Sequence, residues 1–462
     1  MKHVTVKTER DKLVVEAVVR RFGPVSRSDV REYTDLQQSE ISRLVRDLLR
    51  EQRLLEAGRA DNPLGRKQVL LRFNEEHSFV AGVGFDDESV LASVMNLCPS
   101  VKTEVQEATH LREGSNGLVD QLLACTQKAI QKAGIRATSL VGIGVAGSGL
   151  VDTRRGEFLM SSTVDFFKDV PLQRIFEDRF GVPTVLDNLT RAKTVSERRL
   201  GAGSMADDMV FVEYGRTGIG AGVIMNGQLM HGAGFAAGEF GHTHMTDDGP
   251  ACKCGSFGCL EAVAGAAAIE ARMRRAITEG GASEVLALAK GDTQQITGWM
   301  VLEGARRGDK TSLALVEQVG TYLGLGLANL VNLFNPSVLV IDQRLSLAGE
   351  GILDLLRRVV NRQALRHATQ ELAIRFGKLG NEAVVLGVAS IVLEKHFEIP
   401  ALKLPRFMIE SVTTKRSASA QKSLTGDKRK QTPAASHNLT EAGTAKAQHP
   451  AASGAIPVTI AD

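Results

Sequence analysis

The sequence contains no long hydrophobic run. No stretch of its 462 residues approaches the about 18 consecutive apolar residues that a membrane-spanning helix needs. The first residues, MKHVTVKTERDKLVVEAVVRR, also interrupt their apolar positions with charges, whereas a secretory signal peptide has an uninterrupted apolar core. These absences argue against a membrane or secreted protein and predict a cytoplasmic one.

Cysteine is scarce and unevenly placed. Of the five cysteines, Cys98 and Cys125 stand alone in apolar stretches, while Cys252, Cys254 and Cys259 lie within eight positions. A disulfide framework normally uses an even number of spaced cysteines, so an odd and clustered set favours metal binding instead.

Large apolar residues are nearly absent from Lys415 onward. There the chain is mainly Ser, Thr, Ala, Lys and Gln, a composition that cannot offset the entropy of ordering by burial. We therefore expect residues 401–462 to be a disordered tail. Its basic triplet 428–430 could touch nucleic acid non-specifically, but a solvated extension is the simpler interpretation.

The remaining chain is long enough for at least two modules, each with its own core. Net charge is only +3, yet residues 1–74 contain 16 Lys and Arg against 11 Asp and Glu, a local excess of +5. Such an excess favours a polyanionic partner, although a solvated charged face is the alternative. Composition changes near residues 75 and 400, and these positions are the expected module boundaries.

The basic N-terminal segment has the pattern of a winged helix-turn-helix. Apolar residues at Leu13, Val14, Ala17, Val18 and Phe22 predict a helix that ends before Gly-Pro. Ser26 is a good N-cap for a short second helix, a turn follows over 35–38, and SEISRLVRDLLREQRLL predicts a third helix. LLEAGRADNPLGRKQVLLRFN then predicts a strand, a bend and a second strand, which together would form the wing.

Polar side chains lie off the apolar side of the third helix and at the tip of the wing. Near the N-terminus of a recognition helix such side chains suit phosphate and base-edge contacts, and a basic wing tip suits the minor groove. The alternative is a plain three-helix bundle with a surface hairpin. The expected DNA-binding residues are Gln37, Gln38, Ser39, Ser42, Arg43, Arg46, Arg66 and Lys67.

The segment from about 76 to 400 alternates strands and helices, which predicts an α/β architecture. Apolar strands followed by Gly-rich or Asp/Asn turns include LVGIGVAGSGLVD, PTVLDNLT, DDMVFVEYGRTGIGAGVIMNG and SVLVIDQ. Amphipathic helical patterns between them include LVDQLLACTQKAIQKAG and LALVEQVGTYLGLGLANLVNLF.

One loop of this segment contains the predicted ligands of a zinc ion. His242 precedes Cys252, Cys254 and Cys259, and one imidazole with three thiolates completes a tetrahedral Zn(II) site. A closed site of this kind is structural, not catalytic. The alternative is a loop of reduced cysteines beside a core histidine, and His244 is the rival to His242 as ligand.

The sequences GEFGHT and CKCGSFGCLE around these ligands resemble the signature of the ROK family of repressors, open reading frames and sugar kinases. The segment ahead of them resembles the regulator branch of that family. The resemblance implies a two-lobed actin-like ATPase fold, with a small lobe over 76–200 and a large lobe over 201–400 whose last helix returns to the small lobe. It further implies a repressor of sugar-related genes that binds a DNA operator as a homodimer or homotetramer.

The resemblance also locates the position of the catalytic base in family kinases. They take the sugar proton with the aspartate of a Glu-Asn-Asp-Ala-Asn run, which corresponds here to residues 187–191. Leu189 then stands at the base position and cannot accept a proton, so catalysis is not expected. Asp187 would serve only if the loop slipped by two residues.

Two of the three family phosphate sites are altered as well. Gly84 replaces the aspartate associated with magnesium, and acids at 86–88 would repel ATP. Asp342-Gln343 replaces the Gly-Gly expected where the nucleotide rests, whereas the turn over 215–222 keeps glycines that close backbone packing alone would explain. The alternative function is a kinase with residual ATP-dependent activity.

By the same resemblance, Asn188, Glu239, His242 and Glu261 match the family's sugar contacts, with His242 shared between sugar and zinc. Thr163 replaces a sugar-contacting Asn and Phe167 replaces a Trp, so the usual hexose does not follow. A small-molecule sugar or derivative is the expected ligand. The alternatives are a vestigial cleft controlled by a partner, and an N-terminal module that contacts protein instead of DNA.

Overall fold

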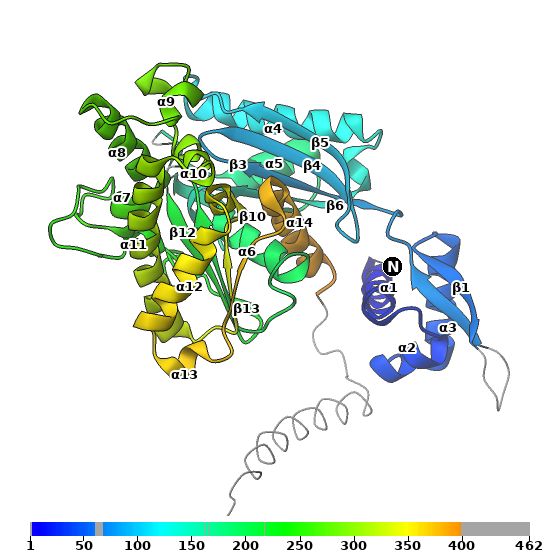
Figure 1. Cartoon of the computed structure of the whole chain (residues 1–462). Coiled ribbons are helices and arrows are strands. Elements are labelled where there is room, and N and C mark those ends of the chain that lie inside the picture. The colour runs from blue at the N-terminus through cyan, green and yellow to red at the C-terminus, as the bar shows by residue number, and fades with distance from the viewer. Residues whose placement is uncertain (1, 61–67, 162, 165, 217, 399–462) are drawn as a thin grey trace, which may run out of the picture. The chain divides into compact units, whose positions relative to one another are not determined.

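The computed structural model describes residues 2–60, 68–161, 163–164, 166–216 and 218–398 (Figure 1). The wing-tip residues Arg66 and Lys67 and the tail over 401–462 lie outside this range. Among the described helices, none is both long and apolar enough to cross a membrane.

The N-terminal elements follow the order expected from the sequence. Ser26 caps the second helix as predicted: its hydroxyl accepts the N–H of Asp29, whose carboxylate accepts the N–H of Ser26. The elements are α1 (Lys2–Phe22), α2 (Arg27–Tyr33), α3 (Gln38–Arg50) and the antiparallel pair β1 (Leu54–Ala60) and β2 (Gln68–Phe73).

The third helix is shorter than the apolar pattern suggested. The sequence pattern continues to residue 55, but α3 ends at Arg50, because Gln52 adopts a left-handed backbone with φ 57° and Arg53 N–H bonds back to the Leu48 carbonyl. Of the apolar positions predicted for the first helix, Ala17 and Val18 are buried and Leu13, Val14 and Phe22 are half-buried, and Val15 and Val19 are buried as well.

The segment after residue 75 contains two five-stranded sheets with the same topology. In each, the second and third strands form an antiparallel meander with the first, and two later strands add in parallel to its other side. The first sheet has the spatial order β10-β6-β3-β4-β5, with β3 (Phe79–Phe85), β4 (Ser89–Asn96), β5 (Val101–Ala108), β6 (Leu140–Gly147) and β10 (Thr184–Asn188). The second has the order β13-β12-β11-β14-β15, with β11 (Met209–Tyr214), β12 (Ile219–Met225), β13 (Gln228–Leu229), β14 (Val338–Ile341) and β15 (Ala373–Phe376). This duplication is the actin-like, sugar-kinase type of fold.

The sheet around β3 is the centre of the small lobe. The helices α4 (Gly114–Lys132) and α5 (Leu172–Phe180) share a hydrophobic cluster with its strands. A short sheet of β7 (Gly149–Asp152), β8 (Glu157–Ser161) and β9 (Lys168–Val170) joins it. The final helix α14 (Ala383–His396) packs on β6 and β3, although it follows the large lobe in sequence.

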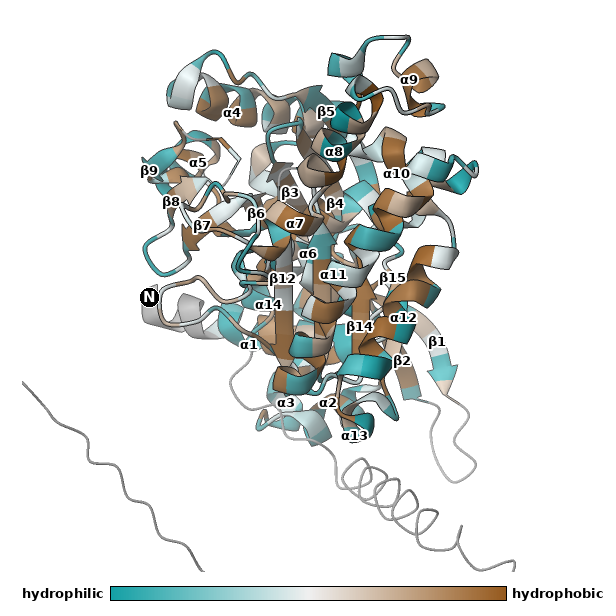
Figure 2. Ribbon diagram, turned by 60° about the vertical axis from the view of Figure 1, so that its left-hand side comes forward, coloured by the Kyte–Doolittle hydropathy of each residue, from teal (hydrophilic) through white to brown (hydrophobic). Residues whose placement is uncertain are grey.

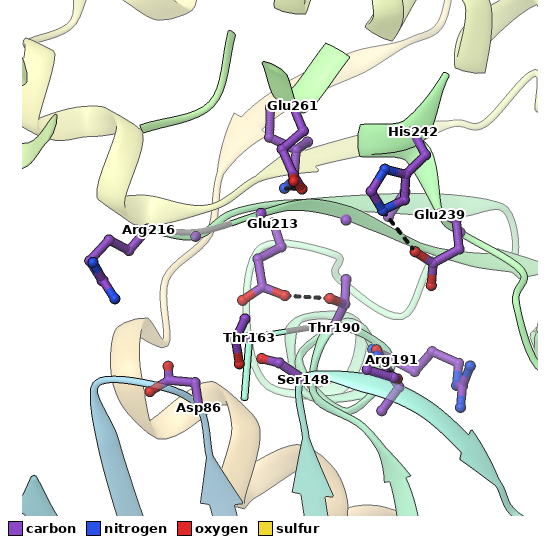
Figure 3. A pocket seen from close by; sticks show the side chains of 18 of the residues that line it. Asp86, Ser148, Thr163, Thr190, Arg191, Glu213, Arg216, Glu239, His242 and Glu261 are labelled. Atoms are coloured by element: carbon purple, nitrogen blue, oxygen red, sulfur yellow. Dashed lines mark hydrogen bonds and ion pairs between the residues drawn. The ribbon is translucent and has the colours of Figure 1, made fainter. Parts of the chain in front are cut away.

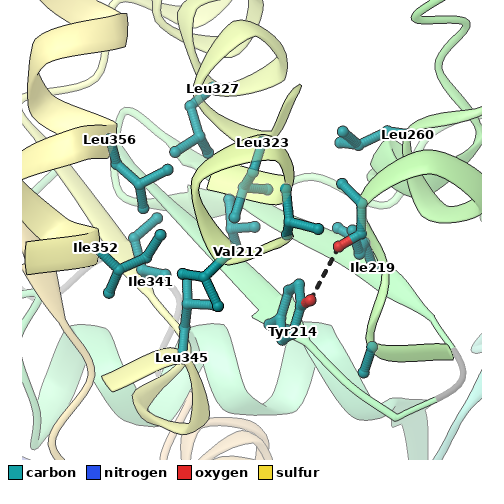
Figure 4. Packing of buried hydrophobic residues seen from close by; sticks show 14 of the residues in the cluster. Val212, Tyr214, Ile219, Leu260, Leu323, Leu327, Ile341, Leu345, Ile352 and Leu356 are labelled. Atoms are coloured by element: carbon teal, nitrogen blue, oxygen red, sulfur yellow. Dashed lines mark hydrogen bonds between the residues drawn. The ribbon is translucent and has the colours of Figure 1, made fainter. Parts of the chain in front are cut away.

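The sheet around β11 is the centre of the large lobe, whose core packs Leu323 and Leu327 against Val212 and Ile341 (Figure 4). The strands β12 and β14 are mainly hydrophobic (Figure 2). The buried Tyr214 hydroxyl donates to the Ala264 carbonyl. The helices of the large lobe are α7 (Leu260–Ala264), α8 (Ala266–Thr278), α9 (Val285–Leu288), α10 (Gly298–Arg306), α11 (Lys310–Phe334), α12 (Gly351–Gln363) and α13 (Arg366–Thr369).

One helix, α6 (Leu189–Arg199), contacts both lobes. It starts directly after β10 of the small lobe and packs against α14, β11 and β12. Most of its polar side chains are buried; the Glu197 carboxylate, for example, accepts the backbone N–H groups of Ala202, Lys378 and Leu379. The start of this helix therefore positions side chains at the junction of the lobes.

Candidate ligand and metal site

The four predicted zinc ligands meet in one cluster of the large lobe. His242 ends the short 3-10 helix η2 (Phe240–His242), Cys259 precedes α7, and Cys252 and Cys254 lie in the loop between them. One ligand atom from each residue lies within 4.8 Å of the others. The chain can therefore hold a metal ion here.

The separations within this cluster fit a tetrahedral metal. With metal–sulfur bonds of about 2.3 Å and metal–nitrogen bonds of about 2.05 Å, sulfur–sulfur edges measure about 3.8 Å and sulfur–nitrogen edges about 3.6 Å. The Sγ atoms of Cys254 and Cys259 are 3.7 Å apart, and Cys252 Sγ lies 3.6 Å from His242 Nδ1. Three soft thiolates and an imidazole are also the donor set that zinc prefers.

Glycine lets the loop fold around this cluster. Gly255 and Gly258 adopt left-handed φ values of 90° and 65°. A Cβ at Gly258 would lie 1.8 Å from the Thr246 carbonyl oxygen, so no other residue fits.

His244 lies outside the cluster. Its Nε2 is 2.9 Å from Asp247 Oδ1, and its Nδ1 is 3.1 Å from the Phe257 carbonyl oxygen. Both ring nitrogens therefore have other partners, which leaves His242 as the histidine beside the three cysteines.

A polar pocket lies between the lobes next to this cluster, and all four predicted ligand-binding residues line it (Figure 3). Asn188 comes from the small lobe, and Glu239, His242 and Glu261 come from the large lobe. The other lining residues with polar side chains are Asp86, Asp87, Glu88, Ser148, Thr163, Thr190, Arg191, Glu213, Arg216 and Arg344.

His242 connects the metal cluster with the pocket through its two ring nitrogens. Nδ1 faces Cys252, whereas Nε2 faces the pocket and lies 3.8 Å from Glu239 Oε2 (Figure 3). A metal on Nδ1 would place the proton on Nε2 and fix the ring orientation.

Glu261 occupies the first turn of α7, beside the glycine turn after β11. Its Oε2 accepts the backbone N–H of Ile219 at 3.2 Å. Burial raises the pKa of Glu261. A carboxyl group in this setting can exchange hydrogen bonds with ligand hydroxyls.

Asn188 is already committed to the fold on both sides of its amide. Its Oδ1 accepts the Arg191 N–H at 3.1 Å as the N-cap of α6, and its Nδ2 donates to the Gly149 carbonyl at 2.8 Å. The side chain is therefore rigidly positioned at the edge of the pocket.

The residue proposed as a substitute base, Asp187, does not line the pocket. Its side chain is buried and lies 2.6 Å from Arg191 Nε and 3.6 Å from His231 Nε2. Burial opposes its ionisation, but the hydrogen bond with His231 and the charge of Arg191 outweigh it and lower the pKa of Asp187. A carboxylate held in this way is a poor proton acceptor.

Leu189 points away from this pocket into a hydrophobic cluster with Ala146, Val384 and Val385. Gly84 lies beside α14, the helix that contains Val384, and a Cβ at position 84 would approach Val384 Cγ1 to 2.5 Å. An aspartate at position 84 would therefore require the Val384 side chain or α14 to move.

Sequence reasoning missed the buried charges around the start of α6. Lys193 Nζ lies 2.8 Å from Glu213 Oε1 and 3.7 Å from Asp342 Oδ2, and Thr190 donates to Glu213. Burial alone would raise the pKa of Glu213, but the charge of Lys193 outweighs it and lowers that pKa. The single acid within the apolar run VFVEY was the available signal.

The two departures from the family's sugar contacts separate in space. Thr163 lines the pocket, whereas Phe167 is fully buried with Phe85 and Phe158, each with its ring centre 5.4 Å away. Phe167 therefore belongs to the small-lobe core and does not line the pocket.

On α3 and at its N-cap, the polar side chains predicted to contact DNA lie mostly at the surface. Ser42 is half-buried and donates to the Gln38 carbonyl, and Arg43 Nη1 lies 3.9 Å from Asp47 Oδ2. The exposed members are Gln37, Gln38, Ser39, Arg43 and Arg46.

Comparison with known proteins places this architecture in context. The ROK family model matches residues 99–395, more than half of the chain. The xylose repressor of Caldicellulosiruptor bescii is 28% identical over 396 residues, which cover 86% of this chain and 98% of that protein.

Two solved structures match the fold. A ROK family transcriptional regulator, a homolog of the Escherichia coli MLC protein, has a TM-score of 0.72 at 23% identity and covers 84% of this chain and 96% of that one. A Streptomyces griseus ROK family glucokinase in complex with glucose and AMPPNP has a TM-score of 0.61 at 30% identity, with 68% and 99% covered. Sequence and fold agree: the chain belongs to the ROK family.

Proposed function

We propose that the protein is a transcriptional repressor controlled by a sugar or sugar derivative. The observation that carries this proposal is the combination, in one chain, of an N-terminal helical module with a polar helix face and a ROK domain in which Leu189 stands at the position expected for the catalytic base. The alignment with the xylose repressor runs over nearly the whole of that protein, since it covers 98% of its length.

DNA recognition is assigned to α3 of a winged helix-turn-helix. Its apolar side is buried by Ile41, Leu44, Val45 and Leu48, so the opposite side is available to enter a major groove. Arg43 and Arg46 would contact phosphates or base edges.

The pocket is assigned to the sugar. Two carboxylates, an amide and an imidazole converge there, and such groups together accept and donate hydrogen bonds to several hydroxyls. A structural zinc on His242, Cys252, Cys254 and Cys259 would hold the imidazole in place, so that metal binding and sugar binding are coupled.

Phosphoryl transfer is not part of this function. Leu189 offers no proton acceptor and Asp187 is paired with Arg191, so the sugar hydroxyl has no base at either position. Loss of a general base typically lowers a rate by about 10² to 10⁴.

For the mechanism, a homodimer would present two copies of α3 about 34 Å apart, one turn of B-DNA. A sugar that binds the open and closed arrangements of the lobes unequally would shift that spacing and release the operator.

Gel-shift titration with genomic fragments tests the repressor function. We expect one site bound at least about 10³-fold more tightly than random DNA, with weaker binding as salt rises. At least one sugar of a tested panel should release the protein from this DNA site.

An Arg46→Ala variant should weaken operator binding about tenfold, whereas Arg275→Ala on the exposed side of α8 should not. Equal affinity for all fragments would contradict the proposal.

The similarity to a glucokinase supports a sugar kinase as the second candidate function. Incubation with ATP and a panel of hexoses and N-acetyl derivatives separates the two. Turnover near the usual kinase range of about 1 to 100 per second would favour the kinase.

A further inference from the structure

Four charged side chains face each other across the pocket. The large lobe contributes Arg216, which follows β11, and Arg344, in the 3-10 helix η4 (Gln343–Ala348); the small lobe contributes Asp87 and Glu88, between β3 and β4. Arg216 forms an ion pair with Asp87, its Nε lies 3.5 Å from Glu88 Oε1, and Arg344 Nη1 lies 3.9 Å from Glu88 Oε2. We propose that these four residues are an ionic clasp that holds the lobes closed without nucleotide or metal.

The small-lobe side of the clasp is firmly built. Asp86 Oδ1 accepts the backbone N–H groups of Glu88 and Ser89 at 2.8 and 2.9 Å, which shapes the tight turn. Thr109 Oγ1 donates to the Asp86 carbonyl at 2.8 Å and ties the turn to the end of β5. The two acids therefore project from a fixed backbone.

The large-lobe side is positioned from behind. The Arg344 guanidinium lies 5.7 Å from the centre of the Trp299 ring, and the Arg344 N–H donates to Asp342 Oδ1 at 2.9 Å. Lys193 forms ion pairs with both Asp342 and Glu213. Arg344 is thus held in the large lobe while its tip reaches the small lobe.

The strength of the clasp suits reversible closure. The Asp87 side chain is 6% exposed, whereas those of Arg344, Glu88 and Arg216 are 26%, 36% and 40% exposed. Partly exposed pairs contribute little singly and are weakened by salt, but several that share partners act together. The acidic turn, expected from the sequence to repel ATP, here pairs with two arginines and joins the lobes.

Distances between the lobes test the clasp directly. Spin labels would be attached to genetically encoded non-natural amino acids in place of Asp120 of α4 and Glu317 of α11, which are both exposed. This labelling leaves the cysteines of the zinc cluster unmodified. Double electron–electron resonance would be measured on the full chain without sugar or DNA, diluted with unlabelled chain to suppress signals between protomers.

In the Arg216→Gln, Arg344→Gln double variant, we expect the fraction of molecules with the short wild-type distance to fall at least about twofold. Raising salt from about 0.05 to 0.5 M should have the same effect on the wild type but not on the variant. A separate variant with the charges of one pair exchanged, Asp87→Arg and Arg216→Asp, should have a larger short-distance fraction than the Arg216→Gln, Arg344→Gln double variant. Arg275→Gln, which removes an exposed ion pair with Glu279 at the end of α8, is the control.

A distance distribution that neither salt nor the double variant changes would overturn the clasp. If the variant does not fold, the wild-type salt series decides the result. Any role of the clasp in regulation rests on the proposed function, but the distance measurement does not depend on it. If the clasp opens as expected and the protein has no preferred operator, the clasp is supported and the repressor function is contradicted.

Discussion

At the scale of single residues, His242 joins two sites, because its ring nitrogens face Cys252 on one side and Glu239 on the other. Replacing a neighbouring metal ligand should therefore affect the sugar as well. For Cys254→Ser we expect loss of most of the bound zinc and a fall in sugar affinity of about tenfold or more. Elemental analysis and calorimetry measure the two effects.

The matched control is Cys98→Ser, since Cys98 is exposed and lies outside the metal cluster. This variant should retain zinc and sugar affinity. Undiminished sugar binding by metal-free Cys254→Ser protein would separate the two sites.

The buried pair of Asp187 and Arg191 is expected to stabilise the start of α6. Asp187→Ala leaves the Arg191 charge buried without its carboxylate, so the free energy of unfolding should fall by about 3 kcal/mol. Asp207→Ala removes an ion pair with Arg198 in which Asp207 is 79% exposed, and should cost less than about 1 kcal/mol. Urea denaturation compares the two variants.

The same pair predicts a pH dependence. The pKa of Asp187 is lowered from 3.8, so its carboxylate stabilises the fold above that pH, and this contribution is lost as pH falls through the lowered pKa. Asp187→Ala should accordingly lose less stability than the wild type on acidification. Parallel acid limbs in the two proteins would disagree with this assignment.

At the scale of elements, two of the glycines retained over 215–222 are explained by the packing of β12 on α6. Cβ atoms at Gly220 and Gly222 would lie 2.8 and 1.8 Å from the hydroxyl oxygens of Thr190 and Thr194 on α6. These two glycines therefore allow β12 to lie against α6 and need no nucleotide to account for them.

Gly222→Ala should destabilise the protein by about 1 to 3 kcal/mol, because the strand and helix must separate. Gly234→Ala has open space around the added Cβ and should change stability little. Denaturation midpoints distinguish the two variants, and equal midpoints would show that α6 can move without cost.

At the scale of the whole molecule, the proposed dimer makes a geometric prediction for its operator. Two copies of α3 require half-sites one helical turn apart, so inserting about five base pairs between them should abolish tight binding. Inserting about ten should restore much of it. Gel shifts on a spacer series measure this, and indifference to spacing would argue for binding as a monomer.

Much of the molecule was predictable from local sequence. The cap at Ser26, the strands and helices of the α/β segment and the clustering of His242 with three cysteines all depend on contacts between near neighbours. The exact end of α3 did not follow, because the apolar pattern continues past the left-handed residue Gln52 that stops the helix.

By itself the sequence determined the ROK resemblance, the order of the elements and which residues carry metal-binding and polar groups, since these depend on residue type and spacing. Only the tertiary structure decided that Lys193 neutralises Glu213 and Asp342, that Leu189 turns into the core, and that Arg216 and Arg344 reach Asp87 and Glu88. These residues lie far apart along the chain. Their pairing comes from the packing of two duplicated lobes around α6, which no local pattern records.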